Sequence, residues 1–245
     1  MNKSSWNSDM RIALLSTVNA PMLCNFIKTF VENNIEIDSI IFDSKIESKK
    51  DLEIYKERTG GKIRYISLYE FENYHIPYFF VQNHSSEVTK SLVLEREIDI
   101  LINAGTPRIL KKNILNTPRI GVLNCHPGLL PEFRGCTCVE WAIYLDEQIG
   151  NTVHFMSDKI DEGPIILKDK LSFLKSDRYE DIRIKVYKNS FDLMTRSIKK
   201  IMKNKIGDIK NINYPNNGKY FGVISNSKLK EVKNKVNNGL YIYQY

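Results

Sequence analysis

The chain has 245 residues, of which 42% are hydrophobic and 27% are charged, with a formal net charge of +7. This composition is typical of a globular protein that can bury a full core. No apolar run approaches the roughly 20 residues of a membrane span, and the polar start lacks the apolar stretch of a signal peptide, so we expect a cytoplasmic protein without a membrane partner. The four cysteines lack zinc-site spacing and the basic residues are scattered, so we expect no metal site and no nucleic-acid partner.

The first third of the chain alternates strand and helix patterns. Apolar runs predict strands over 11–17, 37–42 and 62–67. Hydrophobic residues at helical spacing predict a helix over 22–31, and a highly charged helix-like segment that Gly60 and Gly61 end predicts a second helix over 47–58. Such alternation indicates a parallel sheet with helices on its faces. The turn after the first strand lacks the G-x-G-x-x-G pattern, so the sequence does not support a dinucleotide-binding site.

The rest of the chain continues the alternation and then changes character. After an irregular aromatic stretch at 69–82, the predicted elements are a helix over 83–97, a strand over 98–103, a helix over 106–115, a strand over 120–124, a helix over 138–145 and a strand over 152–156. A long amphipathic helix over 177–203 follows, and then a polar segment and an aromatic tail. We therefore predict an α/β fold with a mostly parallel sheet, a main domain over 1–175, and an appendage over 176–245 made of the long helix and a small C-terminal β-hairpin.

Two polar side chains come at the end of the strand predicted near residue 120. Asn124 and His126 are two residues apart, so on an extended chain they point the same way. The carboxyl end of a parallel sheet is where open α/β folds bind ligands. Cys125 lies between them and should point to the opposite face, which argues against a thiol nucleophile.

A carboxylate follows at Asp161, in a turn closed by Gly163 and Pro164 and within reach of His126. Acyl transfer to an amine passes through an oxyanion that an amide or an imidazolium can stabilise, and a carboxylate can hold the imidazole or accept a proton. Asn124, His126 and Asp161 supply these functions. An Asn-x-His pair and a turn aspartate also occur in purely structural roles, so the residues alone leave both interpretations open.

The segment N-C-H-P-G-L-L-P-E-F-R-G at 124–135 resembles the signature of the folate-dependent formyltransferases. The elements G-x-T-x-H-F at 150–155 and D-x-G-P-I at 161–165 match the same family in order and spacing. The resemblance implies a Rossmann-like formyltransferase domain, N10-formyltetrahydrofolate as the formyl donor, and the three residues above as the catalytic trio. It also implies a cis bond before Pro131, and a place for His154 either in the site or as a hydrogen-bonded strand residue.

The resemblance further implies that the pterin of the folate lies against two loops. The implied donor contacts are Ala104, Gly105, Arg108, Ile109, Leu110, Met156, Asp158 and Ile160. The expected acceptor contacts are Asn83, His84, Pro127, Gly128, Arg134 and Tyr220. Among these, Asn83 opens a helix whose amides suit a phosphate or form an ordinary cap, and Tyr220 with Phe221 forms either a platform for a nucleotide base or part of the core of the tail.

Less specific sequence resemblances narrow the choice of acceptor amine. Enzymes that act on methionyl-tRNA resemble this domain followed by a second barrel, whereas only 84 residues of the 245 follow Asp161. Enzymes that act on glycinamide ribonucleotide carry a Gly-rich loop where this chain has T-V-N-A at 17–20. The segments V-E-W-A at 139–142, G-T-P-R-I-L at 105–110 and G-K-Y-F at 218–221 resemble the sugar N-formyltransferases.

We therefore expect a homodimeric sugar N-formyltransferase that acts on a nucleotide-diphosphate-linked amino-deoxysugar of the dTDP-4-amino-4,6-dideoxyhexose type, for lipopolysaccharide O-antigen. The alternatives are a glycinamide ribonucleotide formyltransferase, a formyltetrahydrofolate hydrolase, and a non-catalytic binding module that retains the fold.

Overall fold

The computed structural model describes residues 10–63, 74–204 and 218–245. In chain order the helices and strands are β1 (Ile12–Ser16), α1 (Leu23–Glu32), β2 (Ser39–Asp43), α2 (Lys49–Thr59), β3 (Tyr78–Val81), α3 (Glu87–Glu95), β4 (Ile100–Asn103), α4 (Lys112–Leu115), β5 (Gly121–His126), β6 (Phe133–Gly135), α5 (Cys138–Tyr144), β7 (Gly150–Phe155), β8 (Ile165–Lys170), α6 (Tyr179–Lys203), β9 (Lys219–Phe221) and α8 (Asn226–Asn237).

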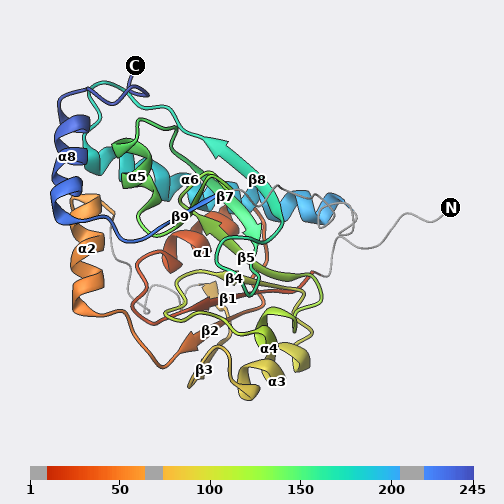
Figure 1. The fold of residues 1–245 in the computed structure, drawn as a ribbon. Helices are drawn as coiled ribbons and strands as arrows, with labels where there is room; N and C mark the ends of the chain where they lie inside the picture. The colour runs from red at the N-terminus through yellow and green to blue at the C-terminus, as the bar shows by residue number, and fades with distance from the viewer. Residues whose placement is uncertain (1–9, 64–73, 205–217) are drawn as a thin grey trace.

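A seven-stranded sheet with the order β3-β2-β1-β4-β5-β7-β8 forms the centre of the molecule (Figure 1). The strands from β3 to β5 are parallel, and β7 and β8 add antiparallel to that end of the sheet. The predicted α/β fold with a mostly parallel sheet is confirmed. The strand order reverses at β1 and β4, and the carboxyl ends of strands at such a reversal are where α/β folds place their ligands.

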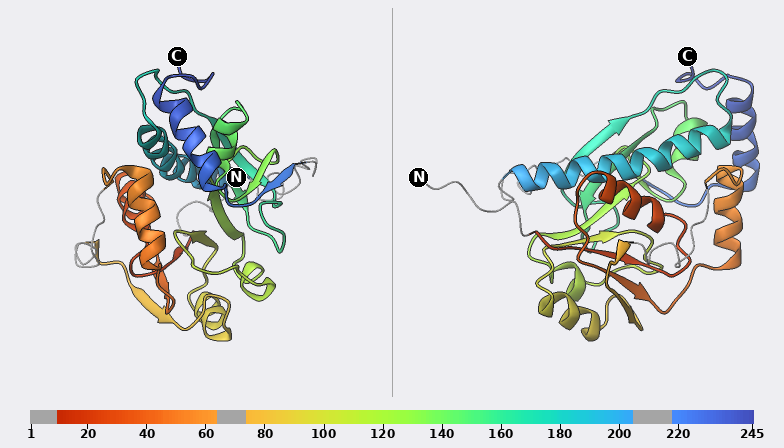
Figure 2. Two further views of the ribbon diagram at one scale, coloured as in Figure 1. Left: turned by 60° about the vertical axis from the view of Figure 1, so that its left-hand side comes forward. Right: turned by 180° about the vertical axis from the view of Figure 1, so that it is seen from behind.

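Helices cover both faces of this sheet because its strands alternate between two apolar surfaces. On β1, Ile12 and Leu14 face α1 and α6, whereas Ala13 and Leu15 face the side of α3 and α4. Figure 2 shows α6 running along one whole side of the molecule next to α1. The second half of α6 shares the central core, so the long helix is packed on the sheet along much of its length.

A second apolar cluster lies beside the sheet and joins α5, α8 and the first half of α6. The short strands β6 and β9 pair in parallel at its border. Phe221 of β9 stacks on Phe133 of β6 with ring centroids 5.1 Å apart. The tail strand was predicted, but its partner is β6 and not a second tail strand of a hairpin, because Phe133 offers it an apolar surface.

Helix α8 was not predicted. Its only buried residues are Val232 and Val236, so its apolar stripe is short and lies among lysines and asparagines. The side chain of Ser225 caps the helix by accepting from the N–H of Lys228. The division of the chain at residue 175 into a catalytic domain and an appendage stays a prediction.

Three other predicted elements differ from the structure or fall outside it. The strand expected over 62–67 lies almost entirely outside the described residues. The third strand of the sheet is β3, within a stretch expected to be irregular. It lies at the edge of the sheet, so that of its apolar residues Y-F-F-V only Val81 is buried. The helix expected over 106–115 is confined to α4, because the preceding loop folds around Asn103, whose Oδ1 accepts from the N–H groups of Gly105 and Thr106.

No helix in the described part of the chain is both long and apolar enough to cross a membrane.

Candidate active site

The pairing of β5 with β7 brings four polar side chains together at the carboxyl end of the parallel strands. Asn124 lies opposite His154, and His126 lies opposite Thr152. Cross-strand partners on one face have Cβ atoms about 5 Å apart, so these side chains are neighbours because of the register. The predicted orientation of Asn124 and His126 toward one face agrees with this pairing.

Asp161 reaches this face from the loop between β7 and β8. Its φ of 56° turns the chain there. Its Oδ2 accepts from the backbone N–H of Gly135 at 2.8 Å and lies 3.4 Å from Nδ1 of His126. Its Oδ1 lies 3.7 Å from Nε2 of His154. The structure therefore brings the three predicted catalytic residues together, and it adds His154 to them.

The imidazole of His126 is buried and its two nitrogens face different groups. Nε2 lies 2.8 Å from the carbonyl oxygen of Phe133, which can only accept, so Nε2 carries the hydrogen and Nδ1 faces Asp161. Burial lowers the pKa of His126, against the opposing effects of Asp161 and the Phe133 carbonyl. The ring is thus neutral until a proton arrives, and Asp161 is in place to stabilise the charged form.

Gly128 and Thr152 hold the loop beside this imidazole. A Cβ at Gly128 would come within 2.7 Å of His126 Nε2 and 2.9 Å of the Phe133 oxygen, so a side chain there would disturb the hydrogen bond between them. Thr152 Oγ1 accepts from the N–H of Leu130 at 3.0 Å and donates to the Gly128 oxygen at 2.7 Å. The Leu130–Pro131 bond is cis, as the resemblance implies. The sequence analysis assigned no role to Thr152, although its spacing of two residues from His154 on a strand places both side chains on one face.

His154 is hydrogen-bonded within its strand, and it also faces the other candidate site residues. Its Nδ1 lies 2.9 Å from the oxygen of Phe155, and its Nε2 lies 3.3 Å from Nδ2 of Asn124. Burial lowers the pKa of His154 to about 4, although Asp161 opposes the shift. His154 is therefore a neutral group at physiological pH, with its Nε2 directed toward the other site residues.

Cys125 packs on the other face of β5, among Asn151 and Ser190 on the side covered by α6. Burial raises the pKa of its thiol to about 12, although hydrogen bonds with Ser190 and Asn151 act in the opposite direction. A thiol with so high a pKa is not ionised at neutral pH and is a poor nucleophile. This agrees with the predicted orientation.

The residues expected to contact the folate flank the trio on two loops. Ala104 is buried and its carbonyl accepts from Ser16 Oγ at 2.9 Å, whereas Ile109 is 77% exposed. On the other loop, Ile160 is 47% exposed and Asp158 forms an ion pair with Lys112. Exposed apolar side chains beside buried polar groups suit a flat aromatic ligand such as a pterin, and these contacts stay predictions.

Three of these residues have mainly internal contacts. Arg108 donates from Nε to both oxygens of Asp43 at 3.0 and 2.9 Å, and so ties its loop to the end of β2. The backbone N–H of Met156 donates to the oxygen of Val122 at 2.7 Å and extends the pairing of β7 with β5. Leu110 is buried in the core beneath α3 and α4.

The residues expected to bind the acceptor are placed unequally. His84 is fully buried, with its ring nitrogens 2.7 Å from Thr106 Oγ1 and 2.9 Å from the Ile41 oxygen, so the protein itself uses both. Asn83 Oδ1 accepts from the N–H of Ser85 in a turn before α3, and the helix itself is capped by Ser86, whose side chain accepts from the N–H of Thr89. Tyr220 is 53% exposed, whereas Phe221 beside it belongs to the core.

Arg134 forms an ion pair with Glu162 and donates to the carbonyl of Gly218 at 2.9 Å. It therefore joins β6 to the loop of Asp161 and to the segment before β9. Pro127 opens the loop that Thr152 holds.

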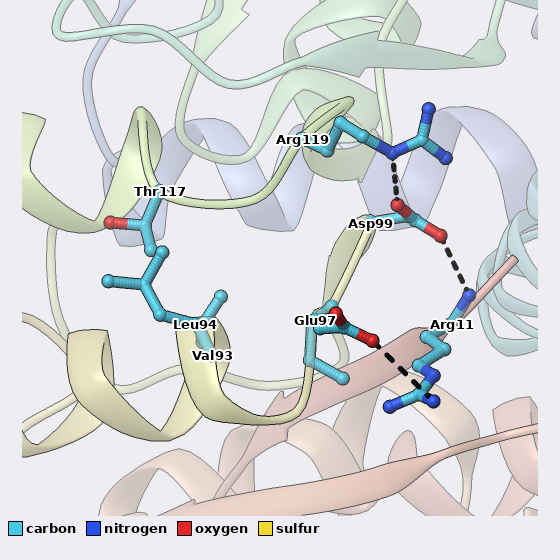
Figure 3. A pocket seen from close by; sticks show the side chains of 8 residues that line it. Arg11, Val93, Leu94, Glu97, Asp99, Thr117 and Arg119 are labelled. Carbon is cyan, nitrogen blue, oxygen red and sulfur yellow. Dashed lines mark hydrogen bonds and ion pairs between the residues drawn. The ribbon is translucent and has the colours of Figure 1, made fainter.

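One pocket of the protein lies far from this site. Figure 3 shows this pocket at the amino ends of β1 and β4, where Arg11 pairs with Glu97 and Arg119 with Asp99. Its volume is about 540 Å³. None of the predicted site residues lines it. Over the described ranges, no group of three histidine, cysteine or acidic side chains is placed to hold a metal ion.

The sequence profile of the formyl transferase family matches residues 10–198. The chain therefore belongs to the formyl transferase family.

Curated relatives match shorter parts of the chain. It is 30% identical over 135 residues to a bifunctional polymyxin resistance protein ArnA of Wigglesworthia glossinidia brevipalpis, covering 55% of this chain and 21% of that protein. It is 32% identical over 106 residues to a methionyl-tRNA formyltransferase of Wolbachia sp. subsp. Drosophila simulans, covering 43% of this chain and 36% of the relative. The match thus spans about a fifth to a third of the length of these relatives.

Solved structures share the fold over most of the chain. A sugar N-formyltransferase from Shewanella sp FDAARGOS_354 superposes with a TM-score of 0.60 at 20% identity, covering 87% of this chain and 76% of that one. Glycinamide ribonucleotide transformylase 1 from Symbiobacterium toebii gives a TM-score of 0.61 at 21% identity, covering 82% and 90%. Since both are below 25% identity, they show the fold and leave the acceptor open.

Proposed function

We propose that this protein is an enzyme that transfers a formyl group from N10-formyltetrahydrofolate to the amine of a nucleotide-diphosphate-linked amino-deoxysugar. The sugar is of the dTDP-4-amino-4,6-dideoxyhexose type, and the product serves the synthesis of a surface polysaccharide such as O-antigen. The observation that carries the proposal is the cluster of Asn124, His126, Asp161 and His154, which provides groups for direct transfer without an acyl-enzyme. Cytoplasmic placement and a homodimer are part of the same proposal.

In this proposal the acceptor nitrogen forms a bond to the formyl carbon, and the bond from that carbon to N10 of the folate then breaks. The intermediate carries an oxyanion on the former carbonyl oxygen. The amide NH2 of Asn124 donates to that oxygen, an interaction whose removal in other enzymes costs a factor of about 10²–10³ in turnover.

The attacking nitrogen loses a proton and N10 gains one, so the site must hold a proton between the two events. The neutral His126 with Asp161 at 3.4 Å supports this role. A proton taken up at Nδ1 produces an imidazolium directed at a carboxylate, and in a buried site this ion pair is stronger than in water. Asp161 is fixed for the purpose by the N–H of Gly135.

The choice of a sugar acceptor rests on two observations. The segments at 105–110, 139–142 and 218–221 resemble the sugar N-formyltransferases, and the exposed Tyr220 lies next to the strand that binds Asp161. A Cβ at Gly135 would meet the Tyr220 ring at 2.9 Å, so the ring packs over the strand that binds Asp161. An exposed aromatic ring at this place suits a nucleotide base. The strongest alternative is a glycinamide ribonucleotide acceptor, because the fold superposes equally well on such a transformylase and the superposition does not separate the two acceptors.

The test is a transfer assay with N10-formyltetrahydrofolate and four samples: dTDP-4-amino-4,6-dideoxyglucose, glycinamide ribonucleotide, methionyl-tRNA, and no acceptor. Folate absorbance reports turnover and mass spectrometry reports the formylated product. We expect formylation of the amino sugar, abolished by Asn124→Ala. Formylation of one of the other two amines alone, or release of formate without an acceptor, would replace the proposed acceptor.

A further inference from the structure

A chain of hydrogen bonds runs through the site from one backbone segment to another. Oδ1 of Asn103 accepts from the N–H of Gly105 at 3.2 Å and of Thr106 at 2.9 Å. Nδ2 of Asn103 donates to Oδ1 of Asn124 at 3.0 Å. Asn124 then reaches His154 Nε2 through Nδ2 at 3.3 Å. Asn103 is the last residue of β4 and is absent from the site that the sequence predicts.

The hydrogen bonds of Asn103 fix the orientation of the Asn124 amide. The groups facing Asn103 are two N–H donors, so the oxygen of its amide must lie toward them and its NH2 must lie toward Asn124. An NH2 group can only donate, so Asn124 must turn its own oxygen toward Asn103. The NH2 of Asn124 is then directed to the other side.

The hydrogen bonds of His154 independently require the same orientation of the Asn124 amide. The oxygen of Phe155 can only accept, so Nδ1 of His154 carries the hydrogen. In a neutral ring, Nε2 is then an acceptor and requires a donor, which is the NH2 of Asn124. A reversed Asn124 would place two donors face to face at Asn103 and two acceptors face to face at His154.

We propose that Asn103 is a positioning residue that orients the amide of Asn124, so that its NH2 group and not its oxygen faces the developing oxyanion; this rests on the catalytic role of Asn124 proposed above. One hydrogen of that NH2 bonds to His154, and the second is available to the substrate. Because Asn103 also holds the N–H groups of 105 and 106, the same side chain couples the expected folate loop to the catalytic amide.

Asn103→Asp separates the two tasks of this side chain. A carboxylate still accepts from both loop N–H groups but cannot donate to Asn124, and it favours the reversed Asn124 amide. In the assay with dTDP-4-amino-4,6-dideoxyglucose, we expect kcat to fall by about 10²-fold with the KM for N10-formyltetrahydrofolate changed by less than about threefold. Asn103→Leu, which loses both tasks, should lower kcat and raise that KM.

A double-mutant cycle distinguishes this role from general damage. If Asn103 acts through Asn124, adding Asn103→Asp to Asn124→Ala should change kcat by less than about twofold. Additive losses would overturn the inference, and so would a nearly normal kcat for Asn103→Asp beside a large loss for Asn124→Ala. If Asn124→Ala itself keeps full activity, the proposed mechanism fails first and the inference fails with it.

A second measurement needs no acceptor. In wild-type protein labelled with ¹⁵N at histidine, two-bond ¹⁵N–¹H correlations at pH 7.5 should show His154 as the neutral tautomer with its hydrogen on Nδ1. A hydrogen on Nε2 would require the reversed Asn124 amide, and that result would overturn the inference even if no turnover were measurable.

Discussion

Two buried histidine–carboxylate pairs lie at the carboxyl ends of the strands, and they differ in how many of their polar atoms have hydrogen-bond partners within the protein. In one pair, His84 Nδ1 lies 3.8 Å from Asp43, and in the other His126 Nδ1 lies 3.4 Å from Asp161. The first pair is closed, because His84 bonds to Thr106 and Ile41. Asp43 accepts from Arg108 and from the N–H groups of residues 45 and 84.

The second pair has fewer partners. Asp161 accepts from Gly135 and faces two histidines, and the neighbouring Asn124 is only partly buried. Polar groups that are fully satisfied stabilise a fold, whereas groups arranged around an open position can bind a substrate and move protons. The same residue types therefore suit structure in one place and the proposed chemistry in the other, and their hydrogen-bond partners make the difference.

The largest effect should come from the open pair. We expect His126→Ala to reduce turnover by about 10²–10⁴-fold while the free energy of unfolding changes little beyond the loss of packing. Steady-state formyl transfer and urea unfolding of the same sample measure both. His84→Ala is the matched control and should show the reverse, with a larger loss of stability than of turnover. A His126→Ala enzyme with near-normal turnover would contradict the distinction.

The closed pair should respond through stability. Burial raises the pKa of Asp43, but the hydrogen bonds from Arg108 and two backbone N–H groups outweigh it and hold that pKa below its usual value. Asp43→Asn removes the charge that Arg108 pairs with, and we expect it to lower the free energy of unfolding by about 2–4 kcal/mol. Urea unfolding checks this. Asp161→Asn should cost less stability and far more turnover, and equal stability losses would contradict the comparison.

Acid should weaken the fold through the histidines of both pairs and through the neighbouring buried His154. Burial lowers the pKa of His84, His126 and His154, the last to about 4, so the unfolded chain takes up protons near pH 6.5 before the folded chain does. The free energy of unfolding should therefore fall as the pH drops from 6.5 toward 4, by up to about 1.4 kcal/mol per pH unit for each such histidine. Urea unfolding between pH 7.5 and 5 measures the slope. His154→Gln should make that slope shallower, and an unchanged slope would argue against a buried neutral ring.

The smallest effect should come from Cys125, which lies between the two proposed catalytic residues on β5. Cys125 faces α6, and its thiol, with a pKa of about 12, has no part in the proposed chemistry. Cys125→Ser should keep turnover within about twofold, with a modest loss of stability from placing a hydroxyl beside Ser190 and Asn151. A large loss of turnover with the fold intact would favour a thiol nucleophile after all.

The sequence by itself determined the local features. The apolar runs at 11–17 and 37–42 specify buried strands, and the 3.6-residue period at 177–203 specifies a long helix, because each signal lies within one short window. The period of two along β5 was enough to separate Asn124 and His126 from Cys125. Asp161 was found from the D-x-G-P-I element at 161–165, whose order and spacing after the strand resemble those of the formyltransferases.

Only the tertiary structure decided which segments meet. The antiparallel addition of β7 to β5 places His154 opposite Asn124, and the end of β4 brings Asn103 against that same amide. The pairing of β9 with β6, the edge strand β3 and the lysine-rich α8 depend likewise on partners distant in sequence. Local periodicity does not encode these contacts, because a strand or a hydrogen-bonded amide is fixed by what lies across from it.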